Sequence, residues 1–324
     1  AFEINNIEIS KPFEINFDKN KVIDEGFSSA FLKLISLITN SADQEKVNQT
    51  KLNRIKGMVE TFSIQEEKFV DEIYYVNLGV SFNKKKVFSY LEEKNIFPSI
   101  PLEKRILFIP VIIDESKKDL LLFSDNKIFE YWNETLENIH LIQYILPTED
   151  LEDINLIKEK FETIEKYDFK EIIKKYDLED SIVALIFKDK KQVRVLSKIN
   201  ILGNTVLKNQ TFLDNNINNE KQVKIIVNDL KLVYEDYWKK LNQINTSIKL
   251  TLNIKSSNLD NKKILNFEKF LNQTDLIYDY YISKFDKNFV YYQIIFNGTP
   301  DSFLKSMKNE NYNFNTQNKI WILK

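Results

Sequence analysis

The chain contains no cysteine, one histidine (His140) and only five glycines among its 324 residues. The lack of cysteine excludes disulfides and thiolate chemistry, and it rules out zinc sites built from Cys and His clusters within one chain. Loops that cradle phosphate need closely spaced glycines, whereas the glycines here lie far apart in the sequence. These absences favour a binding role over a catalytic one, and we expect no catalytic residue, no cofactor and no metal.

Long apolar runs and an excess of charge of one sign are also lacking. The longest strongly apolar run, Ile106–Ile113, is much shorter than the roughly 18 to 20 residues that span a bilayer, so we expect no membrane insertion. Lysine plus arginine (46) nearly balance aspartate plus glutamate (48). No whole-molecule field would draw the chain to nucleic acid, so we expect no nucleic-acid partner and recognition through local surfaces.

What the chain does have is ample apolar content, 43% of residues with 13% aromatic, which is enough for packed cores. Its length and pattern predict an α/β (α+β) fold of three consecutive small modules. The predicted modules are 1–100, 101–245 and 246–324, with a seam at Phe97–Pro101.

In the first module, apolar residues recur every three or four positions from Lys21 to Thr39 and predict an amphipathic helix. A second helix is predicted from Val47 to Val59. Strict alternation from Tyr74 to Phe82 then predicts a strand with one buried face.

The second module opens with Ile106–Ile113, whose apolar residues fit a central strand covered on both faces, and Pro110 predicts a bulge or break within it. We predict a meander after a buried strand at Ser181–Phe187. The helices predicted in this module are Ile128–Trp132, Glu149–Ile164, Asp168–Tyr176 and Glu220–Leu241.

The third module reads as strand, helix, two aromatic strands, helix and strand, the order of a ferredoxin-like βαββαβ unit. Thr299 and Pro300 predict the start of its last helix, since threonine caps helices and proline suits their first position.

Several polar segments could carry chemistry, and each also has a structural explanation. His140 is the only group that titrates near neutrality, yet it starts an apolar strand, which is typical of a hydrogen-bonded structural histidine. The acidic stretch Glu149–Asp153 could bind a divalent cation, but acids in a first helical turn favour capping. Asp214–Asn219 begins like a calcium loop but has Asn219 and Ile225 where glycine and glutamate are required.

Other candidates are surfaces or carboxylates. The aromatic residues Tyr278, Tyr280, Phe289 and Tyr291 invite comparison with RNA-binding sheets, but the glycine-aromatic signature is missing, and aromatic strands commonly pack across a sheet. Lys84–Lys86 could be a basic docking point and is more simply a solvated helix face. Asp114 and Glu115 follow a central strand, where open α/β sheets bind ligands, and they are where a carboxylate-dependent hydrolase would place its acids.

A family resemblance indicates a cellular compartment for the protein. The chain resembles the exported Gram-negative proteins catalogued as domain of unknown function 2066. The segments that carry the resemblance are Tyr75–Phe82, Ile106–Ile113, Leu146–Asp153, Tyr176–Val183, Phe296–Pro300 and Ile320–Leu323.

The resemblance implies export by a signal peptide and residence in the periplasm, and it transfers no catalytic residue. The start at Ala1, directly before a strand-like segment, is typical of a mature exported chain. The central module is also similar to the amino-terminal domain of TolB, a small α/β domain that docks partners. We therefore expect a non-catalytic adaptor that binds an envelope protein or assembly; the alternative is a hydrolase of envelope glycan.

Overall fold

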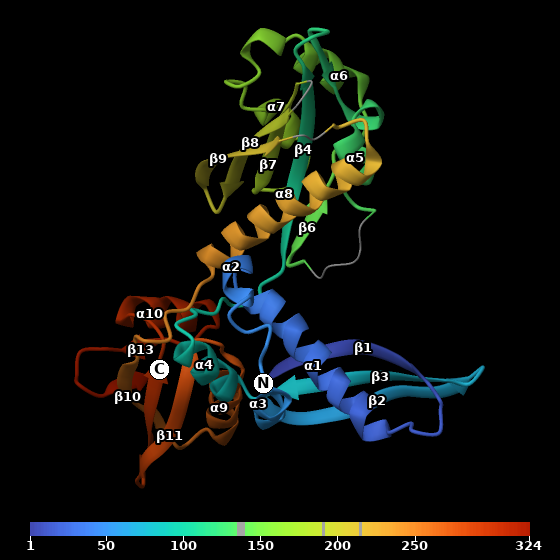
Figure 1. Ribbon diagram of the computed structural model, residues 1–324. Helices are drawn as coiled ribbons and strands as arrows, with labels where there is room; N and C mark the ends of the chain where they lie inside the picture. Colours follow the sequence, from blue (N-terminus) through green and yellow to red (C-terminus); the bar gives the residue numbers. More distant parts are fainter. Residues whose placement is uncertain (135–139, 190–191, 214–215) are drawn as a thin grey trace. The chain divides into compact units, whose positions relative to one another are not determined.

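The computed structural model describes residues 1–134, 140–189, 192–213 and 216–324. The described chain forms two compact units. Unit 1 combines residues 1–101 with 239–324, and unit 2 comprises Leu102–Trp238. Unit 1 contains two β-sheets and unit 2 contains one, each with its own helices (Figure 1). The fold is mixed α+β, which confirms the predicted class.

The amino-terminal sheet of unit 1 has the strand order β1-β3-β2 and is antiparallel. Helix α1 starts after Asp18, whose carboxylate accepts a hydrogen bond from Asn20 N and satisfies one free amide of the first turn. The elements of this part are β1 (Phe2–Pro12), α1 (Lys19–Ile38), α2 (Ser41–Gln44), α3 (Leu52–Met58), β2 (Val59–Val70), β3 (Ile73–Phe82) and α4 (Lys84–Glu93).

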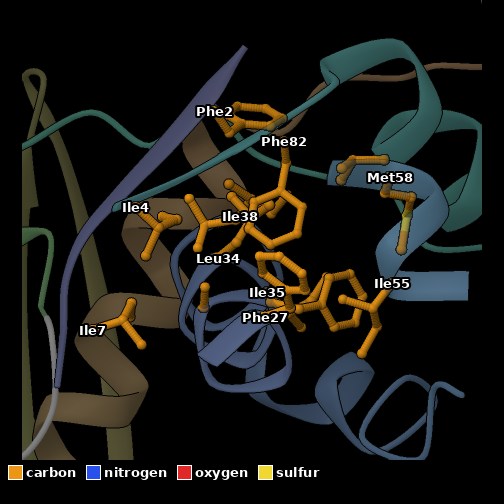
Figure 2. Close-up of a cluster of buried hydrophobic side chains, with 14 of the residues drawn as sticks. Phe2, Ile4, Ile7, Phe27, Leu34, Ile35, Ile38, Ile55, Met58 and Phe82 are labelled. Atoms are coloured by element: carbon orange, nitrogen blue, oxygen red, sulfur yellow. The ribbon is translucent and has the colours of Figure 1, made fainter. Parts of the chain in front are cut away.

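One apolar core holds α1 against this sheet. Leu34 and Ile38 of α1 and Leu78 and Phe82 of β3 are at most 1% exposed, and Figure 2 shows Leu34 and Ile38 beside Phe82. Gly26 allows the close approach, because a Cβ at this position would lie 2.3 Å from a Leu78 methyl group. The predicted helix and the predicted alternating strand therefore bury their apolar sides in the same core.

The helix predicted from Val47 to Val59 is shorter in the structure, since α3 spans only Leu52–Met58 and Val59 begins β2. β2 pairs with β3 across a turn at Asp71 and Glu72, which both have positive φ. Every residue of β2 after Val59 is exposed. A strand without a buried face needs no alternation of apolar and polar residues, so its sequence gave no period-two pattern.

Unit 2 is built on a six-stranded sheet with the order β5-β4-β7-β8-β9, in which β6 also pairs with β4. The long helix α8 has the predicted bounds, whereas α6 and α7 are shorter than predicted. The elements are β4 (Lys104–Asp114), β5 (Asp119–Leu121), η1 (Phe123–Asp125), α5 (Lys127–Tyr131), β6 (Ile142–Ile145), α6 (Leu151–Lys158), η2 (Phe161–Thr163), α7 (Lys170–Ile173), β7 (Ser181–Lys188), β8 (Gln192–Ile201), β9 (Asn204–Leu213) and α8 (Glu220–Leu241).

Pro110 does not break β4, which contradicts the predicted bulge. β4 pairs with β7 in unbroken register from Leu107 to Asp114. On its other side, β6 pairs only as far as Leu107 and β5 only from Ile112 onwards. Pro110 lies in this gap, where its carbonyl accepts a hydrogen bond from Asn126 Nδ2 (3.0 Å). Because no strand faces this position, the missing proline N–H costs no ladder hydrogen bond.

The carboxy-terminal sheet of unit 1 has the order β11-β12-β10-β14-β13. In the sheet, β11, β12, β10 and β14 lie in the ferredoxin-like order. However, β14 runs parallel to β10, because the chain first forms the short antiparallel pair of β13 and β14. As predicted, Thr299 caps α10, with reciprocal bonds to Ser302. The elements are β10 (Leu250–Ser257), α9 (Asn261–Gln273), β11 (Ile277–Phe285), β12 (Phe289–Phe296), α10 (Pro300–Asn309), β13 (Phe314–Asn315) and β14 (Trp321–Leu323).

Candidate functional site

Asp114 at the end of β4 is one of the two acids on which the hydrolase alternative depends. Its buried carboxylate accepts hydrogen bonds from Ser116 Oγ (2.6 Å), Lys117 N (3.2 Å) and Lys188 Nζ (3.3 Å). The Ser116 hydroxyl, followed by the Lys117 amide and Lys188, holds the pKa of Asp114 below its ordinary value. Glu115 is exposed. Asp114 anchors a turn, and its carboxylate is kept ionised rather than poised to donate a proton.

The acidic stretch Glu149–Asp153 caps α6, as predicted. Asp150 accepts a hydrogen bond from Glu152 N (2.8 Å), and this bond, together with Lys175, lowers the pKa of Asp150. Lys175 Nζ lies 3.1 Å from Asp150 Oδ2 and 2.7 Å from Asp153 Oδ1. A lysine ammonium thus occupies the place that a cation would take. In the described parts of the chain, no group of three or more His, Asp or Glu side chains could hold a metal ion.

The segment resembling a calcium loop is only partly described, because Asp214 and Asn215 lie outside the described residues. Asn219 Oδ1 accepts hydrogen bonds from Lys221 N (3.0 Å) and Gln222 N (3.4 Å) at the start of α8. Asn219 therefore acts as a cap for the helix, as its position before the long helix suggests.

His140 lies next to a buried anchor between α8 and β6. Glu235 of α8 accepts hydrogen bonds from Leu141 N (3.2 Å) and Ile142 N (2.8 Å), and His140 Nδ1 is 3.8 Å from Glu235 Oε1. Glu235 satisfies the amides at the start of β6 and fixes that strand to the helix. This arrangement supports the structural interpretation of His140.

The basic run Lys84–Lys86 is not a uniformly solvated helix face, and the expectation is wrong for Lys84. The side chain of Lys84 is only 10% exposed, and its ammonium donates to Thr274 O (2.8 Å) and Asp275 Oδ1 (3.2 Å). Lys85 pairs with Asp279, and Lys86 donates to Gly57 O. The run ties the amino-terminal part of unit 1 to its carboxy-terminal part, which requires contacts that no sequence spacing reveals.

The aromatic residues of the carboxy-terminal sheet divide between its two faces. Tyr280 packs on the helix side, where its hydroxyl accepts a hydrogen bond from Asn272 Nδ2 (2.9 Å). On the other face, the ammonium of Lys255 lies 4.4 Å from the Phe289 ring centre, and that of Lys284 lies 5.2 Å from the Tyr291 ring centre. Rings covered by neighbouring lysines favour packing across the sheet over base stacking.

The free edge of β9 is the surface feature that sequence reasoning did not single out. β9 pairs with β8 over ten residue pairs without a register shift. On its other side, no strand among the described residues pairs with it, so the outer backbone edge of residues 204–212 is open. Figure 1 shows β9 at the border of its sheet. The strand contains one charged residue, Lys208, and exposes Leu207 (60%).

No helix in the described part of the chain is long and apolar enough to cross a membrane. Comparison with protein-family models and with curated proteins gives no match. The resemblance to domain of unknown function 2066 therefore stays a prediction.

Proposed function

We propose that this chain is a non-catalytic adaptor of the cell envelope that docks an extended segment of an envelope protein against β9. The observation that carries the proposal is the open, unbulged and almost uncharged edge of that strand. An incoming strand would gain main-chain hydrogen bonds along the edge, and its side chains would lie beside those of β9.

The other edges are less suited to strand addition. β2 and β11 each contain two register shifts in their pairing, β1 contains one and ends in Pro12, and β13 has only two residues. Bulges and proline are the devices by which natural sheets prevent unwanted pairing at an edge. The edge strands β5 and β6 have only three and four residues. By this criterion, β9 has the longest unobstructed edge among the described strands.

The carboxylates argue against the alternative of an envelope-glycan hydrolase. Such an enzyme needs one carboxylic acid with a raised pKa facing a second carboxylate. Hydrogen bonds and ion pairs instead lower the pKa of Asp114, Asp150 and Asp168. Burial alone raises the pKa of Asp229. A cavity lies along β6 and the start of β4, and Glu103 is the acidic residue among the described residues that line it. This pattern supports binding rather than acid–base catalysis.

The periplasmic location belongs to the same proposal and rests on the family resemblance. The resemblance points to a compartment in which partners are envelope proteins. The absence of cysteine is compatible with an oxidising compartment, because no thiol is present to form unwanted disulfides.

Site-specific photo-crosslinking tests the adaptor proposal. A photoreactive amino acid replaces Leu207 on β9 or, as the control, Leu151 on α6, which is at least as exposed. Each protein is purified from envelope extract after illumination. We expect the same envelope protein to be recovered repeatedly from position 207 and not from position 151. The Leu207→Glu variant should lose this partner while its stability stays within about 0.5 kcal/mol of the wild type, because the site is exposed.

Equal recovery from both positions, or no recovered partner together with turnover of cell-wall fragments by the purified protein, would contradict the adaptor function. Retention of the partner by Leu207→Glu would place the docking surface elsewhere than on β9.

A further inference from the structure

Unit 2 contains a cavity that the adaptor function does not use. It has a volume of about 780 Å³ and lies along β6 and the start of β4, with α8 contributing Lys231. Two cationic side chains that line it decide its chemistry: Lys231 and Arg105.

Lys231 is a largely buried cation whose ammonium makes no hydrogen bond or ion pair within the described ranges. The residue is 3% exposed. Its ammonium lies 5.4 Å from the centre of the Trp132 ring, and the nearby carboxylate of Glu235 favours its charged form. Glu235, one turn further along α8, is engaged by the amides of Leu141 and Ile142. The three N–H donors of Lys231 are therefore available in a cavity.

Tyr144 contributes to the cavity wall, but its hydroxyl is buried behind the wall and cannot contact a ligand in the cavity. Its hydroxyl is buried and has no hydrogen-bond partner among the residues that the structure describes. The neighbouring Trp132, whose ring centre is 5.2 Å from that of Tyr144, has a buried Nε1–H in the same condition. Most buried polar groups in folded proteins are hydrogen bonded, and each exception requires an explanation such as a bound ion or water.

The lining also carries excess positive charge. Arg105 is exposed, and no other described residue pairs with its guanidinium group, whereas Lys104 is paired with Asp180 at 2.5 Å. Glu103 is the acidic residue that the described lining contains. Unsatisfied donors and surplus cations together select for a ligand that accepts hydrogen bonds and is negatively charged.

We propose that this cavity binds the oxyanion group of a small molecule, a carboxylate or a phosphate, through Lys231 Nζ. Arg105, from the neighbouring strand, adds long-range attraction. A bound oxyanion would supply the acceptors that the ammonium of Lys231 lacks within the described ranges.

Calorimetric titration of the full chain with inorganic phosphate and with acetate at low ionic strength tests the site and distinguishes the two sources of the anion. We expect one of them to bind the wild type. Lys231→Met should weaken that binding by about 10- to 100-fold, since a hydrogen bond from a charged donor is lost. Arg105→Met should weaken it by about 2- to 5-fold, since part of the long-range attraction is lost. Lys198→Met removes one positive charge elsewhere in unit 2 and should change binding by less than about twofold.

Two results would overturn the proposal: failure of both anions to bind the wild type at millimolar concentration, or binding to Lys231→Met as tight as to the wild type. The latter would assign the unpaired donors to structural water. Arg105→Met keeps the test decisive if the lysine variant fails to fold, because Arg105 is exposed and unchanged affinity in this variant also contradicts the proposed site.

Discussion

Two lysines, one in each unit, are largely withdrawn from water, and their surroundings are opposite. In unit 1 the ammonium of Lys84 donates to Thr274 O and to Asp275. In unit 2 the ammonium of Lys231 has no such partner within the described ranges. Burial lowers the pKa of both lysines, and a nearby carboxylate, Asp275 or Glu235, partly opposes the shift.

The difference separates two reasons for burying a charge. A buried ion that is fully hydrogen bonded holds elements together, and removing one partner leaves the other unsatisfied. A buried ion without a partner reduces stability, so its presence requires a gain of another kind, such as binding. By this reasoning Lys84 serves the architecture of unit 1, and Lys231 serves a ligand.

The largest expected effect is the loss of the satisfied lysine. Lys84→Met should lower the free energy of unfolding by about 1.5 to 3 kcal/mol, because Thr274 O and Asp275 lose a charged donor. Urea unfolding followed by tryptophan fluorescence measures the change, with the exposed Lys21→Met as the control. A loss below about 0.5 kcal/mol, the range of ordinary surface substitutions, would show that Lys84 does not hold the two parts of unit 1 together.

The same substitution at Lys231 should act in the opposite direction. Lys231→Met removes an uncompensated buried charge and should leave the free energy of unfolding unchanged or raise it by about 1 kcal/mol, because apolar replacements of buried charges are often neutral or stabilising. The same urea titration in anion-free buffer provides the measurement. A loss as large as that of Lys84→Met would mean that Lys231 has a structural partner, and the comparison would fail.

Two buried tyrosine hydroxyls of unit 2 repeat the comparison on a smaller scale. Tyr234 Oη is hydrogen bonded to Ser197 Oγ (2.7 Å), whereas Tyr144 Oη has no partner among the described residues. Tyr234→Phe should cost about 1 kcal/mol, and Tyr144→Phe should cost nothing or stabilise slightly. Thermal unfolding of both variants tests this difference, and equal losses would contradict it.

The elements that the sequence predicted well are those whose burial imposes a period. The stripe of α1, the alternation of β3 and the apolar run of β4 all follow from a buried face, as does the long helix Glu220–Leu241. The bounds of β2 were not predicted, because burial imposes no alternation on its exposed residues. The bulge or break predicted from Pro110 was wrong, because a strand tolerates proline where no neighbouring strand pairs with it. Where β5 and β6 stop pairing with β4 is a property of the assembled sheet.

The site features could not be predicted for a related reason. Lys84, Lys231 and Tyr144 are ordinary residues in helices and strands, and only tertiary contacts show which of their polar atoms find partners. The capping of α6 by Asp150 was predictable, because a cap needs only the neighbouring backbone. Unsatisfied donors arise from contacts distant in sequence, so a single chain without its fold gives no signal for them.

The pH dependence of stability should resolve the smallest difference. A lysine whose pKa is lowered in the folded state loses its proton at a lower pH than in the unfolded chain, so the penalty for its charge is complete below the lowered pKa. The penalty declines as pH rises from the lowered pKa towards the unfolded value of about 10.4. The free energy of unfolding of the wild type should therefore rise relative to Lys231→Met between these two pH values. Urea titrations of both proteins from pH 7 to 10 measure the gap, and tyrosine ionisation cancels in the difference. A constant gap would mean that the ammonium of Lys231 is as well solvated in the fold as in the unfolded chain, and the case for an unsatisfied cation in unit 2 would be lost.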